Sequence, residues 1–247
     1  MDLLEVWQMR RRYPYAVAFK IVLMLAAVGG IALQCMGGAE GFSLQPFKMF
    51  PTLSNLFVVF YQAVQISALV QTRGEEDFSH PIQFMSLVTV VLSGLITLVM
   101  GKYQFAGNRA MLLAAMILMN IIVPLMSIID WMFFTRKGTY EPYYPLLSLI
   151  PLAVYVAAVY IGKAAGFPLG PSTENPYPYD FLNLEVMGVV KILIVCIIIG
   201  GAAVMLGWFL YKADYVLSWQ QAEEKENKKK KSRRKRSRTK KDQTEKS

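Results

Sequence analysis

The stretch MLLAAMILMNIIVPLMSIIDWMFF, residues 111–134, is apolar along almost its whole length. As a helix it would be long enough to cross the roughly 30 Å of hydrocarbon in a bilayer. Three of its residues are nevertheless ones that hydrocarbon penalises: Asn120, Pro124 and Asp130. The stretch therefore predicts a membrane-spanning helix that carries a polar feature.

The rest of the 247-residue chain repeats this pattern, with 55% hydrophobic residues and charges gathered at the ends and in short gaps. Long apolar runs predict six spans, at Ala16–Met36, Leu53–Gln71, Ile82–Met100, Ala110–Phe133, Leu146–Lys163 and Val186–Tyr211. A lipid-facing backbone must satisfy its own hydrogen bonds, and no segment alternates like a barrel strand. The predicted fold is an all-α polytopic membrane protein with six transmembrane helices in one bundle.

We divide the chain into an N-terminal segment, 1–15, a six-helix transmembrane domain, 16–211, and a basic tail, 212–247. Arg10, Arg11 and Arg12 precede the first span, but that span is long and no A-x-A site follows, so we expect a retained helix and not a signal peptide. The distribution of Lys and Arg, which the tail dominates, predicts that both termini are cytoplasmic.

The tail holds 14 Lys or Arg and 6 Asp or Glu, and its densest piece, KKKKSRRKRSRTKK, has no apolar side chain to bury. We therefore expect it to be disordered. It could bind anionic lipid head groups or RNA, or serve only as a solvated anchor that sets the topology.

Motifs for common catalytic chemistry are missing from the sequence. Cys35 and Cys196 both fall in predicted spans, and no Cys/His cluster suggests a metal site. The single histidine, His80, lies in a predicted surface turn. No phosphate loop or dinucleotide fingerprint is present, so we expect neither a metal nor another cofactor.

Polar residues inside the fourth span share one helical face. Asn120, Pro124, Ser127 and Trp131 follow one another at helical spacing. Pro124 has no N–H to offer the carbonyl of Asn120, so we expect a kink and a polar spot near the middle of the membrane. Asp130 lies further along, and we expect its charge to reach the interface or Arg136.

The second span opens with FPTLSNLFVVFYQAVQ. Ser54, Tyr61 and Gln65 share a face of this helix, and Asn55 and Gln62 lie next to it. Such a polar stripe is expected to face the bundle interior. The third span has a milder stripe of small hydroxyl residues, which we interpret as a packing surface: Ser86, Thr89, Ser93 and Thr97.

The loop GFPLGPSTENPYPYDFLNLE precedes the sixth span and is rich in proline and aromatic residues. It could cap the outer mouth of the bundle, or its rings could form an aromatic belt at the interface. If it is a cap, Tyr179 and Asp180 could converge with Ser54 and Asn55, with Asn120 deeper in the bundle.

Several of these motifs together resemble the bacterial six-helix relatives of the androgen-induced-gene-one and FAR-17a family. They are FPTLSNL at the start of span two, N-x-x-x-P leading to IIDW in span four, YYPLLSLIPLAVYV in span five and YPYDFLN before span six. The resemblance implies six spans in a bacterial cytoplasmic membrane with both ends cytosolic. Animal members of that family are intramembrane hydrolases of fatty acid esters of hydroxy fatty acids, with a threonine nucleophile and a histidine.

Carried onto this chain, the resemblance implies Ser54 at the nucleophile position and Asn120 at the histidine position. Asparagine cannot take the proton of a hydroxyl near neutral pH, although its amide can donate a hydrogen bond. We therefore expect a non-hydrolytic protein that binds a lipid or another amphiphile through Asn55, Tyr61, Gln62, Gln65, Asn120, Tyr179 and Asp180. Two alternatives remain open, an active lipid-ester hydrolase with Ser54 as nucleophile, and a small-solute transporter or a substrate-binding membrane subunit.

Overall fold

The computed structural model describes residues 3–39, 41–73, 79–100, 107–170 and 176–244, and in this part of the chain it is built of helices. The α-helices are α1 (Leu3–Met36), α2 (Phe50–Gln71), α3 (His80–Met100), α4 (Arg109–Ile117), α5 (Val123–Phe134), α6 (Tyr144–Leu147), α7 (Leu149–Ala164) and α8 (Leu184–Thr244). Short 3-10 turns lie at η1 (Gln45–Lys48) and η3 (Asp180–Leu182), and a π-helical turn, η2 (Leu118–Ile122), joins α4 to α5.

Six stretches of helix in this part of the chain are long and apolar enough to cross a membrane. They run over Tyr13–Met36, Phe50–Gln71, His80–Val99, Arg109–Phe134, Tyr144–Ala164 and Leu184–Gln220. The predicted all-α, six-span architecture is therefore confirmed. The predicted boundaries agree to within three residues, except that the last apolar stretch continues past Tyr211.

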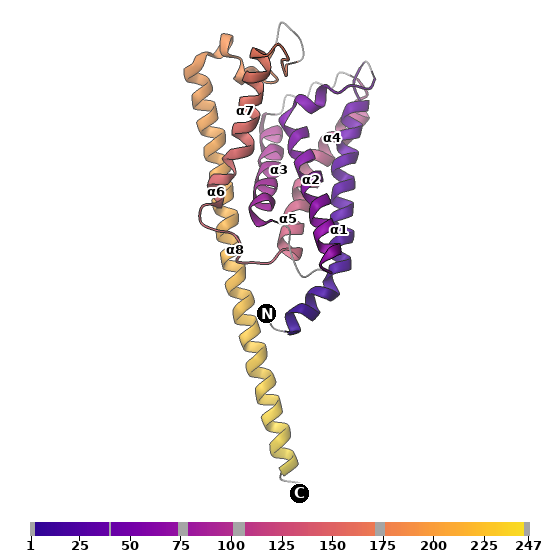
Figure 1. Ribbon diagram of the computed structural model, residues 1–247, viewed down its shortest axis with the longest axis vertical. Helices are drawn as coiled ribbons and strands as arrows, with labels where there is room; N and C mark the ends of the chain where they lie inside the picture. Colours follow the sequence, from indigo (N-terminus) through magenta and orange to yellow (C-terminus); the bar gives the residue numbers. More distant parts are fainter. Residues whose placement is uncertain (1–2, 40, 74–78, 101–106, 171–175, 245–247) are drawn as a thin grey trace.

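Helix α3 lies at the centre of the molecule and joins two groups of helices (Figure 1). On one side it contacts α2, η2 and α5, which also pack against α1; on the other it contacts α6, α7 and α8. Its apolar stretch is 61% buried, compared with 11% for that of α8. The two termini lie at the same end of the bundle (Figure 1).

The described part of the loop before α8 packs onto the opposite end of the bundle from the termini, as the capping interpretation predicts. Tyr177 is fully buried and meets Tyr160 of α7 edge to face, with 5.9 Å between ring centroids. The hydroxyl of Tyr179 accepts a hydrogen bond of 3.1 Å from the backbone N–H of Phe50, the first residue of α2. Residues 171–175 of this loop lie outside the described part of the chain.

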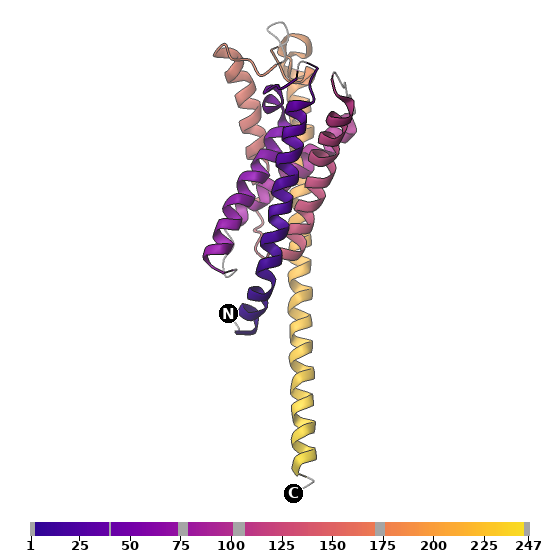
Figure 2. The same cartoon turned by 90° about the vertical axis from the view of Figure 1, so that its right-hand side faces the viewer.

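The tail differs from its prediction, because the structure continues α8 as helix to Thr244 where the sequence predicted disorder. Lys, Arg, Glu and Gln, which make up most of this segment, all have favourable helix propensity, and the segment extends a helix that is already formed in span six. The absence of apolar residues alone therefore does not decide the conformation of this segment. Figure 2 shows the helix extending well beyond the bundle.

Candidate functional site

A buried ion pair connects α1 to α5 in the half of the bundle nearer to the termini. The ammonium group of Lys20 lies 2.8 Å from Oδ1 and 2.6 Å from Oδ2 of Asp130. Lys20 is 1% exposed and Asp130 is 2% exposed. The expectation that Asp130 reaches the interface is therefore wrong, because a lysine from the first span neutralises its charge inside the bundle.

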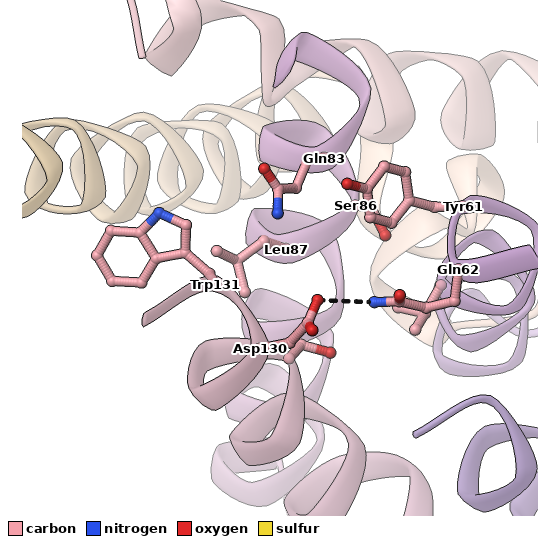
Figure 3. A pocket seen from close by; sticks show the side chains of 9 residues that line it. Tyr61, Gln62, Gln83, Ser86, Leu87, Asp130 and Trp131 are labelled. Atoms are coloured by element: carbon pink, nitrogen blue, oxygen red, sulfur yellow. Dashed lines mark hydrogen bonds between the residues drawn. The ribbon is translucent and has the colours of Figure 1, made fainter. Parts of the chain in front are cut away.

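Gln62 brings α2 into the same polar network. Its Nε2 donates a hydrogen bond of 3.2 Å to Oδ2 of Asp130, drawn as the dashed line in Figure 3. Its Oε1 is buried and has no hydrogen-bond partner among the residues that the structure describes. A buried acceptor without a donor is unfavourable, so this oxygen indicates a place where water or a ligand can supply a hydrogen bond.

A small cavity borders this network, between α2, α3 and α5 (Figure 3). Its volume is about 10 Å³ for the centre of a water molecule, which is room for about one water. The apolar part of its wall consists of Val58, Leu87 and Trp131. The polar part consists of Tyr61, Gln62, Gln83, Ser86, Ser127 and Asp130.

The polar break predicted in span four exists, and it is the π-helical turn η2 just before Pro124. Gly94 of α3 packs directly against it, since a Cβ atom on that glycine would lie 2.6 Å from the carbonyl oxygen of Asn120. From α2, Nδ2 of Asn55 donates to the carbonyl of Met119 over 3.2 Å. A π turn of this kind provides backbone groups for contacts between helices.

Asn120 itself points along its own helix. Its Nδ2 donates to the carbonyl of Met116 at 3.1 Å, and its Oδ1 has no partner within the described chain. It does not line the cavity beside Asp130. Asn55 and Asn120 thus lie close together at η2, while Tyr61 and Gln62 lie at the cavity.

The start of α2 forms a third polar location. The hydroxyl of Ser54 donates a hydrogen bond of 2.9 Å to the carbonyl of Pro51, and Ser54 is 1% exposed. Nδ2 of Asn55 donates to the same carbonyl over 2.8 Å. Tyr179 reaches this end of α2, whereas Asp180 is exposed.

The predicted polar stripe of α2 does face the interior, because Ser54, Asn55, Tyr61, Gln62 and Gln65 are all buried. The structure distributes these residues among separate locations, however, because residues that share a helical face are still separated along its axis. Ser54 and Gln65 are eleven residues apart, or roughly 16 Å at about 1.5 Å per residue. The predicted set of ligand-binding residues therefore does not form one pocket.

A second charged cluster lies where α5 ends, next to the Asp130 network, and its lysine, Lys137, follows the fourth span. The ammonium group of Lys137 lies 3.8 Å from the ring centre of Trp131 and donates to that residue's carbonyl. Burial lowers the pKa of Lys137 to about 8, and the carboxylates of Asp214 and Asp130 offset part of this effect.

Asp214 of α8 holds the turn that follows Lys137. Its Oδ2 accepts hydrogen bonds from the backbone N–H groups of Gly138, Thr139 and Tyr140, at 2.8, 3.0 and 3.2 Å. Asp214 is 1% exposed. Three backbone donors directed at one carboxylate form a concave anion site that the protein itself fills.

Four polar residues in this region were not predicted from the sequence: Lys20, Gln83, Lys137 and Asp214. For Lys20 a signal was available, because a charged residue within an apolar span usually has a polar partner inside the bundle. No comparable signal identified Asp130 as that partner.

Comparison of the chain with protein-family models, curated proteins and solved structures gives no match. The evidence on its function is therefore the site itself.

Proposed function

We propose that this protein is a non-hydrolytic membrane protein that binds a small amphiphile, with the polar group of the amphiphile at the cavity beside Asp130, Lys20 and Gln62. The observation that carries the proposal is a buried ion pair next to a cavity. The wall of this cavity includes Oε1 of Gln62, an acceptor that no donor in the described part of the chain reaches. Ionisable residues inside a membrane protein are unfavourable unless partnered, and they commonly mark ligand or ion sites.

The chemistry of the cavity wall narrows the class of ligand. The carboxylate of Asp130 and Oε1 of Gln62 are acceptors, so they favour a group that donates hydrogen bonds. Since the cavity has room for about one water, the group that fits is of the size of a hydroxyl or an ammonium. The apolar wall that this group would meet consists of Val58, Leu87 and Trp131.

The surroundings of Ser54 support binding without hydrolysis. A serine hydroxyl needs a base to become a nucleophile, and that of Ser54 donates to a carbonyl of its own helix. His80 begins α3, near the level at which α2 ends, and the axial distance along α2 from Ser54 to Gln71 is roughly 26 Å. Asn120 occupies the position at which the family resemblance implies histidine, and its amide donates to Met116.

Transport is the second candidate function, because a buried ion pair can also belong to the path of a solute or a proton. Uptake by proteoliposomes separates the two. Accumulation of a polar solute that is lost in Asp130→Asn would favour transport over simple binding.

The proposal is tested by identifying the small molecules that co-purify with the protein in detergent. Wild type, Gln62→Leu and the control Gln71→Leu are purified in mild detergent and compared by native mass spectrometry and by organic extraction. Gln71 lies on the same helix but is exposed, and its amide donates a hydrogen bond to Ser67 one turn earlier.

We expect an amphiphile with a hydroxyl or amine group in wild type and in Gln71→Leu, and its loss from a folded Gln62→Leu variant. An empty wild-type protein, or equal occupancy in all three, would contradict the proposal. Fluorophosphonate labelling that disappears in Ser54→Ala would instead establish the hydrolase alternative.

A further inference from the structure

Helix α8 is attached firmly to the bundle near the end of its apolar stretch, which runs to Gln220. Asp214 holds the turn at residues 138–140 through three hydrogen bonds. One turn further along, the side chain of Ser218 packs on Gly138, where an added Cβ atom would lie 2.9 Å from Cβ of Ser218. These contacts fix the direction in which the helix continues.

Beyond this attachment the helix extends away from the bundle as a single rod (Figures 1 and 2). Trp219, near the end of the last apolar stretch, is 66% exposed, and a tryptophan here suits the membrane interface. At about 1.5 Å per residue, Lys225 lies roughly 9 Å beyond Trp219 along the axis, and Lys241 roughly 33 Å beyond it.

The projecting part is strongly basic, whereas the protein as a whole has a net charge of +9. Residues 225–241 contain twelve Lys or Arg and a single Glu, and no aromatic or aliphatic residue. Over this length the helix has about one basic residue per 2 Å of axis. Electrostatic attraction to a membrane surface falls off within a Debye length, about 8 Å at physiological salt, so most of these charges lie beyond its range.

We propose that the segment 225–241 of α8 binds the phosphate backbone of nucleic acid in the aqueous phase, not the head groups of the membrane. The charge density of the segment matches that of a nucleic-acid duplex, which carries about one negative charge per 1.7 Å. Without aromatic residues the segment cannot stack on bases, so recognition does not depend on base sequence.

The experiment uses the full chain in nanodiscs of neutral phosphatidylcholine and a fluorescent 20-base-pair RNA duplex. Binding is followed by anisotropy between 50 and 200 mM KCl. For six or more phosphate contacts, Kd is expected to rise on the order of 10³-fold over this range. Two duplexes of unrelated sequence should bind equally.

A variant in the segment 225–241 and a matched control variant elsewhere test whether this segment is the RNA-binding site. Replacing Lys228, Lys229, Lys230 and Lys231 by Gln should lower the salt slope by about 3 to 4, because each neutralised phosphate contributes about 0.9. Lys163→Gln, at the opposite end of the bundle, should leave both Kd and slope unchanged.

Absence of RNA binding at 50 mM KCl would overturn the proposal. So would loss of RNA binding on transfer to nanodiscs with 30% anionic lipid, since the helix would then lie on the membrane. Binding that persists in anionic nanodiscs with the same tail dependence supports it. None of these results depends on the amphiphile at Asp130.

Discussion

Removing either partner of the Lys20–Asp130 pair should destabilise the protein far more than removing both. Each group is almost fully buried, and the two carboxylate oxygens both lie within hydrogen-bond distance of the ammonium. Lys20→Met leaves a buried carboxylate without its counter-ion, and Asp130→Leu leaves a buried ammonium. Breaking a buried pair in this way typically costs about 3–5 kcal/mol.

The double variant, Lys20→Met with Asp130→Leu, removes both charges and replaces them with apolar groups. Such replacements are often close to neutral, so the main loss is the hydrogen bond from Gln62, about 1–2 kcal/mol. The double variant should thus be more stable than either single variant. The coupling between the two sites should amount to several kcal/mol.

The free energies come from equilibrium unfolding by SDS in mixed micelles, followed by tryptophan fluorescence. Trp131, next to Asp130 in α5, provides a local signal. The control is Glu185→Gln, which breaks the Lys163–Glu185 pair of 2.7 Å on the surface and should change nothing measurable. Single variants that behave like this control, or a double variant whose loss equals the sum of the singles, would refute the reasoning.

Three further predictions concern other parts of the structure. Gly94→Ala should lower the melting temperature by several degrees, because its Cβ would lie 2.6 Å from the carbonyl oxygen of Asn120, whereas Gly29→Ala meets nothing within 4 Å and should be tolerated. Between about pH 8 and 10.5 the folded protein has released the Lys137 proton while the unfolded chain still holds it, so this residue makes stability rise with pH, and Lys137→Met should flatten that rise in pH-dependent unfolding. Tyr179→Phe removes the acceptor for the first backbone N–H of α2 and should cost about 1 kcal/mol, measured by the same unfolding assay.

The fold could be predicted from the sequence because membrane-spanning helices are decided locally. Length and apolarity alone indicate each span, and a missing N–H at Pro124 is enough to place the irregular turn beside Asn120. The inward orientation of the polar stripe on α2 follows from the same reasoning, since polar groups avoid lipid.

The site could not be predicted in the same way, because it depends on which helices meet. Lys20 and Asp130 are 110 residues apart, and neither position specifies the other. A polar stripe shows which face of a helix points inward, but not which of its residues share a site. It therefore does not show that Ser54 lies at one end of α2 while Gln62 lies at the cavity. Depth and partner are fixed only by the packing of α1, α2, α3 and α5.

The separation of the two charges along the chain also bears on how the protein is made. Chain elongation at about 5–20 residues per second means that Asp130 is synthesised roughly 5 to 20 s after Lys20. Throughout that interval the first span carries an ammonium group without its carboxylate, which hydrocarbon disfavours. We expect the ammonium group of Lys20 to stay near the water or in the insertion machinery during that interval. The fourth span then supplies the carboxylate that lets this group be buried between α1 and α5.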